Sequence, residues 1–292
     1  MGYNKSIEPK GDHMYIIKEK KNLTETTTMM VIDAPHIVKH AKVGQFVMVR
    51  ALDTSERIPL TIADKDKSKG FITIIFQVVG ASTYELNQLN ENDSIQDIVG
   101  PLGKPSELEG LERVLLIGGG VGCAILYPIA EQLRFQHAEI MTIIGFRTQS
   151  QIFLESEFIN VSSRFSITTD DGSYGEKGRV TDLMIKLLEE DHAFDKVIAI
   201  GPIVMMKAVT EVAKRYHLPI TVSMNPIMVD GTGMCGGCRV SVGGQMMFAC
   251  VDGPEFDGML VDYDMAIKRN QLYQKEENEA YQKMMMKEED MR

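Results

Sequence analysis

The chain has 292 residues, which is enough for two domains, or for two domains and a small appendage. Hydrophobic residues make up 44% of it, so folded cores can form and a compositionally disordered chain is excluded. The net charge of −10 argues against a nucleic-acid partner, because proteins hold such partners by neutralising their phosphates.

The sequence shows no sign of a membrane or secreted protein. It has no apolar run of roughly 18 residues free of glycine and charge, so no membrane span is expected. The first residues lack the basic and then apolar pattern of a signal sequence. Cys123 lies far from the other cysteines, so we expect reduced thiols in a cytoplasmic setting rather than a disulfide framework.

Residues 1–13 are polar and without pattern, and they are expected to form a tail outside the fold. Residues 14–108 contain short runs in which apolar and polar residues alternate, with turn residues between them at even spacing. This pattern predicts a closed or nearly closed antiparallel β-barrel domain. The runs are "YIIKEKKNL", "TTMMVIDA", "GQFVMVRA", "PLTIADKD" and "GFITIIFQVVG".

Residues 109–223 alternate apolar strands with helical segments, which predicts an α/β domain with a parallel sheet covered on both faces. Residues 224–262 hold three cysteines and are expected to form a small C-terminal subdomain. Within them, "RVSVGGQMMFAC" predicts a hairpin that turns at Gly243–Gly244 and returns Cys250 to the other cysteines. Residues 263–292 are charged and predict a helical tail at the surface.

A glycine-rich loop between a strand and a helix is the first candidate site. Glycine permits a tight turn and lets the backbone approach a pyrophosphate, which the N–H groups of the following helix stabilise. A tight turn without a ligand would have the same short motif, but the surrounding βαβ pattern favours nucleotide binding. The loop comprises Gly118, Gly119, Gly120, Val121 and Gly122, and Gly201 and Pro202 end a later strand where ligands of such sheets bind.

Two residues near this loop have more than one interpretation. Arg147 ends the next strand and could contact an adenosine ribose, a 2′-phosphate or a surface carboxylate, so the sequence does not separate NAD from NADP. Cys123 follows the glycines and is interpreted as a small buried residue without chemistry.

Four motifs together resemble the ferredoxin–NADP reductase superfamily, namely "RIPLTIAD", "GPLGKP", "GGGVG" and "GPIVMM". In that superfamily an FAD lies on the barrel and a nicotinamide nucleotide on the second domain. The cysteine segment narrows the resemblance to the branch with the dihydroorotate dehydrogenase electron-transfer subunit. The chain is more similar still to the small (alpha) subunit of NADH-dependent reduced ferredoxin:NADP oxidoreductase and the beta subunit of sulfide dehydrogenase, over nearly all of residues 14–265.

The resemblance implies a flavin motif made of Arg57, Pro59, Leu60 and Thr61. It places Thr61 beside the flavin N5, as the catalytic position, and Arg57 at the FAD diphosphate. Many relatives have the Arg three residues before the Ser or Thr, whereas Arg57 is four before Thr61. Successive strand residues face opposite sides, so this departure leaves the contact of Arg57 open, with a surface ion pair as the alternative.

The resemblance also implies cofactor-binding roles for two further loops. Gly80, Ser82 and Thr83 resemble the loop that donates hydrogen bonds to FAD phosphate oxygens. Asp170 and Asp171 resemble the loop on the nucleotide side, although a plain Asp-Gly turn would have the same letters.

The cysteine segment has the spacing D-x4-C-x2-C-x11-C, close to the plant-type pattern for a [2Fe–2S] cluster. The ligands are expected to be Asp230, Cys235, Cys238 and Cys250, since the more similar relatives also have an aspartate at the first position. Two alternatives stay open at this stage. Zinc accepts three thiolates and a carboxylate, or Asp230 is a turn residue and another group fills the fourth position.

The resemblance implies an electron-transfer subunit that exchanges a hydride between NAD(H), or NADP(H), and FAD. The [2Fe–2S] cluster would relay single electrons to a larger subunit with a second flavin and [4Fe–4S] clusters, so a heterodimer is expected, with ferredoxin reached through that partner. One alternative is a dihydroorotate dehydrogenase electron-transfer subunit, which Asp230 in place of cysteine disfavours. Another is a non-catalytic docking subunit, which the intact motifs disfavour.

Overall fold

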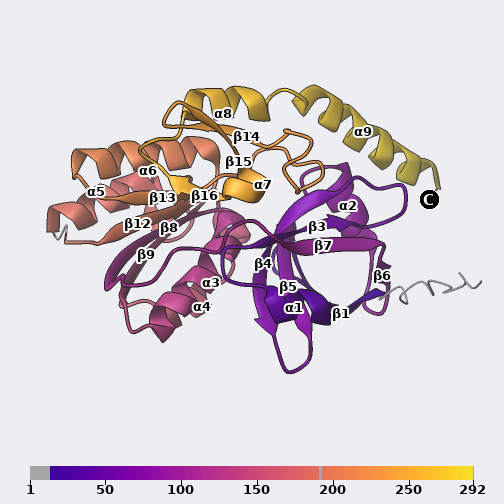
Figure 1. Ribbon diagram of the computed structural model, residues 1–292, viewed down its shortest axis with the longest axis horizontal. Coiled ribbons are helices and arrows are strands. Elements are labelled where there is room, and N and C mark those ends of the chain that lie inside the picture. The colour runs from indigo at the N-terminus through magenta and orange to yellow at the C-terminus, as the bar shows by residue number, and fades with distance from the viewer. Residues whose placement is uncertain (1–13, 191–192, 292) are drawn as a thin grey trace, which may run out of the picture.

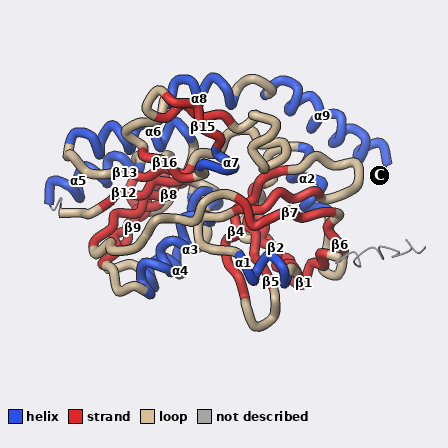
Figure 2. The backbone as a smooth tube through the Cα atoms, in the orientation of Figure 1, coloured by secondary structure: helices blue, strands red, loops and turns tan. Residues whose placement is uncertain are grey.

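The computed structural model describes residues 14–190 and 193–291, and the predicted tail 1–13 lies outside them. An antiparallel sheet forms the first part, in the strand order β6-β1-β2-β5-β4-β3-β7 (Figures 1 and 2). Its two edge strands are separated in sequence by Gln96 alone, so the sheet must curl until its edges approach each other. The predicted antiparallel barrel is confirmed. Its elements are β1 Tyr15–Asn22, β2 Thr27–Asp33, α1 Pro35–His40, β3 Phe46–Arg50, β4 Ile58–Asp66, β5 Phe71–Gln77, α2 Ala81–Gln88, β6 Ser94–Ile95 and β7 Asp97–Leu102.

A second sheet follows in the order β11-β10-β9-β8-β12-β13-β16, parallel except for its last strand. The chain starts at β8, builds β9 and β10 on one side, and then crosses to β12 on the other. The strand order therefore reverses between β8 and β12, the place where open α/β sheets bind ligands. The elements are β8 Arg113–Gly119, α3 Gly122–Phe135, β9 Glu139–Phe146, η1 Gln149–Gln151, α4 Glu155–Val161, β10 Arg164–Thr169, β11 Glu176–Lys177, α5 Val180–Glu190, β12 Lys196–Ile200, α6 Ile203–Arg215, β13 Ile220–Ser223 and β16 Glu255–Asp257.

Helices cover both faces of this sheet, as the sequence predicted. One core joins the sheet to α3 and α4, and another joins it to α5 and α6. The central strands are apolar on both sides, because each of their faces meets a helix layer. In α5 the buried residues recur at helical spacing, at Val180, Leu183, Met184, Leu187 and Leu188.

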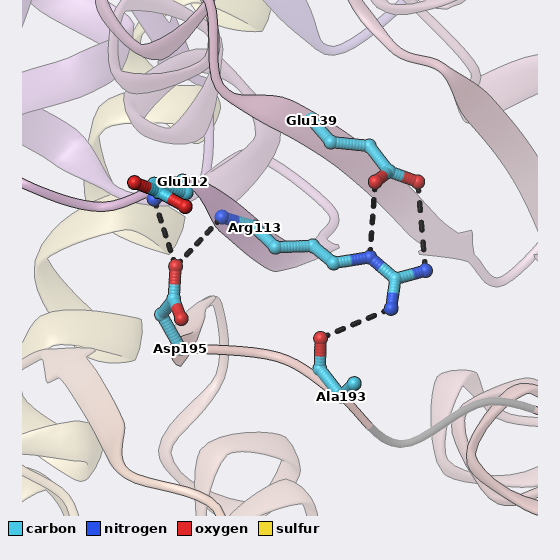
Figure 3. A network of polar contacts seen from close by, with 5 residues as sticks. All are labelled: Glu112, Arg113, Glu139, Ala193 and Asp195. Atoms are coloured by element: carbon cyan, nitrogen blue, oxygen red, sulfur yellow. Dashed lines mark hydrogen bonds and ion pairs between the residues drawn. The ribbon is translucent and has the colours of Figure 1, made fainter.

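A polar network fastens the starts of three neighbouring strands (Figure 3). The Asp195 carboxylate accepts hydrogen bonds from the backbone N–H groups of Glu112 and Arg113, each at 2.7 Å. These hydrogen bonds lower the pKa of Asp195. The Arg113 guanidinium pairs with Glu139 at 3.0 Å and donates to the Ala193 carbonyl. The network lies at the N-terminal ends of β8, β9 and β12, so the candidate site, which follows their C-terminal ends, is at the opposite edge of the sheet.

The C-terminal part begins with the predicted hairpin, which is confirmed. Strands β14 Arg239–Val242 and β15 Gln245–Phe248 pair around Gly243 and Gly244, both at positive φ. Then come α7 Ala249–Asp252, β16, α8 Tyr263–Asn270 and α9 Gln274–Met291. Strand β16 lies within the segment expected to form the cysteine subdomain, yet it adds an antiparallel edge to the nucleotide sheet.

The predicted helical tail consists of two helices with different surroundings. Helix α8 packs on α6, where the hydroxyl groups of Tyr263 and Thr210 lie 2.7 Å apart and Lys207 pairs with Asp264 at 2.6 Å. Helix α9 extends across to α2 of the barrel and meets it through an edge-to-face contact of Tyr281 with Tyr84 (Figure 1). Within the described ranges, no helix is both long and apolar enough to cross a membrane.

Strand β3 is buried on both sides and connects the parts of the molecule. Val47 and Val49 point into the barrel core, whereas Phe46 and Met48 belong to the core that contains the cysteine segment and the α5–α6 layer. Side chains of a strand alternate between its faces, so these two pairs point in opposite directions. The cysteine segment therefore sits on the outer wall of the barrel.

Docking of α8 can be tested with two tyrosines of the tail. The Tyr263 side chain is 7% exposed and Tyr273 is 56% exposed. We expect Tyr263→Ala to lower the free energy of unfolding by about 3 kcal/mol, because it leaves a cavity and an unpaired Thr210 hydroxyl. The matched variant Tyr273→Ala should change it by less than about 0.5 kcal/mol in urea denaturation. Equal effects of the two changes would mean that α8 is not docked in solution.

Candidate functional site

The glycine loop turns sharply between β8 and α3. Gly120 has φ +52° and accepts an N–H bond from Cys123, while its own N–H donates to the Gly145 carbonyl at 2.9 Å. A methyl group on Gly122 would lie 2.5 Å from the Ile200 carbonyl oxygen, whereas one on Gly120 would meet no atom within 4 Å. The glycine at 122 thus allows close packing of helix on strand, and the one at 120 leaves open space beside the turn.

Met205 covers the ends of the two central strands. A Cβ atom on Gly119, at the end of β8, would collide with the Met205 sulfur, and one on Gly201, after β12, would lie 2.8 Å from its methyl group. The absence of a side chain at positions 119 and 201 thus leaves the space that the Met205 side chain fills. Pro202 follows directly and precedes α6, so the structure brings both predicted segments to the point where strand order reverses.

The next two strands also end at this edge. Arg147 follows β9 and is exposed, and the Asp171 N–H donates to its carbonyl at 3.2 Å. Asp170 and Asp171 follow β10, so the structure brings these three predicted residues together. The Asp171 carboxylate accepts from the Ser173 hydroxyl at 2.6 Å and its N–H at 2.9 Å, which lowers the pKa of Asp171. Asp171 thus caps an Asp-Gly turn.

On the barrel, the proposed flavin motif lies on β4. Thr61 pairs with Phe46 of β3, and Pro59 pairs with Met48. Directly opposite residues of antiparallel strands point to the same side, so Thr61 and Pro59 face outward with Phe46 and Met48. Leu60 pairs with Val47 and packs against the barrel core.

Arg57 makes an ion pair instead of pointing freely into a site. Its Nε and Nη2 atoms both donate to the same Asp97 carboxylate oxygen, at 3.1 and 2.6 Å. Of the two contacts considered for Arg57 from the sequence, an FAD phosphate or a surface ion pair, the structure shows the ion pair, with Asp97. The pair is partly exposed, so it contributes little to stability by itself.

The loop of Gly80, Ser82 and Thr83 begins helix α2, which was not expected from the sequence pattern. The Thr83 hydroxyl accepts from the N–H groups of Val79 and Gly80 and donates to the Gly80 carbonyl at 2.9 Å. Its proton is thus used within the helix cap. Ser82 has no such bond to a described residue, and a methyl group on Gly80 would meet nothing within 4 Å.

The cysteine loop packs directly on the barrel wall. A methyl group on Gly231 would lie 2.7 Å from the Met48 side chain and 2.8 Å from that of Leu102. Gly231 also has φ +76°, a conformation that favours glycine. Met48 is two residues from Phe46, the partner of Thr61, so the loop and Thr61 share one face of β3 and β4 about 7 Å apart along the strand.

Two of the four expected ligands are in contact. The sulfur atoms of Cys238 and Cys250 lie 3.2 Å apart, and the Cys250 N–H points at the Cys238 sulfur at 3.4 Å. Cys235 is exposed, and its sulfur receives the Gly237 N–H at 3.4 Å. The Asp230 carboxylate accepts from the N–H groups of Thr232 at 2.9 Å and Cys235 at 3.1 Å.

Three thiols and a carboxylate are side chains of the type that bind an iron–sulfur cluster, although the four do not converge on one position here. Among the described residues, no group of three or more His, Cys, Asp or Glu side chains is close enough to hold one metal ion. Burial, then the neighbouring Cys238 thiol and the Asp230 charge, raise the pKa of Cys250 to about 12. A bound cation would offset this and favour the thiolate, and backbone N–H groups already point at two sulfur atoms.

Two arginines near these loops were not singled out from the sequence. Arg269 of α8 donates from Nη2 to the Gly237 carbonyl at 3.0 Å, inside the C-x2-C turn. Arg50 ends β3 and lies 3.8 Å from Asp53. In both arginines the buried Nε has no partner among the described residues. A lone arginine in a charged tail carries no motif, so only the folded structure reveals the Arg269 contact.

Family models match two parts of the chain. Residues 116–211 match the oxidoreductase NAD-binding domain. Residues 225–262 match the iron–sulfur cluster binding domain of dihydroorotate dehydrogenase B. The first match includes the glycine loop and the second includes Asp230 and all three clustered cysteines.

Individual relatives cover almost the whole chain. A dihydroorotate dehydrogenase B (NAD(+)) electron transfer subunit homolog from Thermotoga maritima is 48% identical, over 92% of this chain and 95% of that protein. The electron transfer subunit of dihydroorotate dehydrogenase B from Geobacillus thermodenitrificans is 32% identical, over 84% and 96%.

Solved structures agree with this relationship. A chain of the NADH-dependent reduced ferredoxin–NADP oxidoreductase, studied for flavin-based electron bifurcation, matches with a TM-score of 0.88 and 46% identity, over 95% of this chain and 100% of that one. The Amycolatopsis cytochrome P450 reductase shares the fold alone, with a TM-score of 0.59 and 19% identity, over 70% of this chain and 66% of that one.

The fold and the matched domains define an oxidoreductase subunit of the ferredoxin–NADP reductase type, with an NAD-binding domain and an iron–sulfur-binding segment. The chain belongs to the family of dihydroorotate dehydrogenase B electron-transfer subunits and their homologues. The superfamily resemblance drawn from the sequence motifs is thereby confirmed.

Gly122 provides a test of the loop geometry. We expect Gly122→Ala to lower the free energy of unfolding by about 1–3 kcal/mol, because the new methyl group collides with the Ile200 carbonyl oxygen. The control Gly80→Ala adds its methyl group in open space and should stay within about 0.5 kcal/mol. Thermal and urea denaturation without added cofactor measure both, and a stability unchanged by Gly122→Ala would contradict the close contact of α3 with β12.

Proposed function

We propose that this chain is the NADH-oxidising or NAD-reducing electron-transfer subunit of a larger complex, with FAD on the barrel and a [2Fe–2S] cluster in the cysteine loop. When bound, the flavin would exchange a hydride with the nicotinamide nucleotide, and the cluster would carry single electrons. The chain itself would bind these groups, orient them and exclude water. No general base is required, since hydride transfer needs none.

The shared outer face of β3 and β4 is the observation that carries this proposal. Thr61 lies on this face, and the cysteine loop packs through Gly231 onto Met48 of the same face. A flavin held at Thr61 would therefore be next to the loop. A structural zinc knuckle needs no such neighbour, so the arrangement favours an electron-transfer cluster over zinc.

On the barrel, Thr61 would contact the flavin ring and Pro59 would shape the wall beside it. The Ser82 hydroxyl would donate to an FAD phosphate and Gly80 would leave space for that phosphate, since the Thr83 hydroxyl and the Gly80 N–H are both used within the helix cap. Arg57 would reach a phosphate only after sharing or leaving Asp97. The proposed ligands of the cluster are Asp230 and the thiolates of the cysteines at 235, 238 and 250.

On the second domain, the loop 118–122 and the segment Gly201–Pro202 would hold the nicotinamide nucleotide at the reversal of strand order. Arg147 and the turn at Asp170–Asp171 lie at the same edge, beside the neighbouring strands, where an adenosine end could be bound. We propose NAD(H) rather than NADP(H) as the substrate.

A larger partner subunit is part of the proposal. Several large apolar side chains of the cysteine segment are exposed, which is unfavourable in water and typical of an interaction surface. They are Val229, Met234, Met246 and Val251. A partner on this face would receive electrons from the cluster, and ferredoxin would be reached through that partner.

Anaerobic purification tests the cofactor content and the nucleotide preference. We expect about one FAD, two irons and two sulfides per chain, and faster bleaching of the flavin by NADH than by NADPH. Metal analysis, absorbance and stopped-flow reduction measure these quantities. Zinc or no metal in the loop of a flavin-loaded protein would overturn the cluster, and faster reduction by NADPH would overturn the choice of NADH.

Asp230 tests the composition of the cluster site. Asp230→Ala should lose iron, with about a 10- to 100-fold faster release to a chelator, whereas Asp230→Cys should retain it with an altered absorption spectrum. Asp257→Ala is the matched control, because Asp257 likewise accepts a backbone N–H, from Met259 at 2.9 Å, but lies outside the cysteine loop. Iron retention in Asp230→Ala equal to that in the control would show that another group provides the fourth ligand.

A further inference from the structure

Arg269 connects a docked helix to the turn between two proposed cluster ligands. Its Nη2 donates to the Gly237 carbonyl at 3.0 Å, and Gly237 directly precedes Cys238. The Gly237–Cys238 peptide is trans, so its carbonyl and its N–H point in opposite directions. By holding the carbonyl on the α8 side, Arg269 directs the Cys238 N–H to the other side of the turn.

The helix that carries Arg269 is itself fixed in place. Tyr263 and Ala266 of α8 are buried, and the Tyr263–Thr210 and Asp264–Lys207 contacts attach the helix to α6. The guanidinium thus reaches the turn from a rigid support rather than from a free tail. This distinguishes Arg269 from Lys268, its exposed neighbour on the same helix.

The Arg269 guanidinium has no acidic partner among the described residues. Its Nε is buried without a hydrogen-bond partner, and it makes no ion pair with an Asp or Glu of the described chain. Arg269 is partly buried, and partial removal of a cation from water is unfavourable unless an anion lies nearby. A [2Fe–2S] cluster held by three thiolates and a carboxylate carries net negative charge, so it would supply the missing anion.

We propose that Arg269 is a positioning residue for the cluster, which fixes the C-x2-C turn and provides a permanent positive charge beside it. This inference rests on the proposed function. A nearby cation stabilises the more negative, reduced form of the cluster, so Arg269 raises its reduction potential. A residue with only a structural role would hold the turn without this effect on the potential.

Three single variants of the full chain, purified anaerobically, separate position from charge. Arg269→Gln removes the charge, Arg269→Lys keeps it but loses the planar fork, and Lys268→Gln removes an equal charge one residue away. The cluster potential is measured by redox titration followed by electron paramagnetic resonance, and iron release to a chelator is timed. Flavin content and circular dichroism verify folding.

We expect Arg269→Gln to lower the reduction potential of the cluster and to release iron about 10- to 100-fold faster. Arg269→Lys should retain most of the potential while releasing iron faster than the unsubstituted chain, and Lys268→Gln should match that chain in both. A potential in Arg269→Gln equal to that in Lys268→Gln would overturn the inference alone. Absence of an iron–sulfur cluster from the unsubstituted chain would overturn both the inference and the proposed function.

Discussion

Burial of β3 on both faces is the constraint on which the arrangement of the molecule depends. Its valines close the barrel core, while Phe46 and Met48 complete the core that includes the cysteine segment. If the outer face of β3 were polar and solvated, the cysteine segment would have no apolar surface to pack against. Because β4 pairs with β3, the same strand that seats the cysteine loop also sets the position of Thr61. One strand thus determines the distance between the two proposed redox groups.

The parallel sheet contributes through its topology. Reversal of the strand order between β8 and β12 places the two glycine-containing strand ends side by side, where Met205 lies over both. The C-terminal segment then returns to this sheet through β16 and to its helix layer through α8. Nucleotide domain and cysteine loop are therefore held by one continuous core rather than by a flexible linker.

The sequence predicted those features that depend on local pattern. Alternation gave the barrel strands, the βαβ pattern gave the parallel sheet, and the two glycines gave the hairpin that brings Cys250 to Cys238. It missed features that depend on contacts between distant residues. An ion pair of Arg57 was one of the two alternatives, but its partner Asp97 was not predicted, and neither was the Arg269–Gly237 bond, because nothing near either arginine in sequence indicates its partner. Convergence of Asp230 and Cys235 with the other ligands stays a prediction, since it depends on a bound metal.

Helix α9 has a practical consequence for work with this chain. It follows α8, which packs on α6 along the upper edge of the molecule, and runs to α2 of the barrel (Figure 1). A label or fused protein joined after this helix would consequently emerge over the barrel, far from α5.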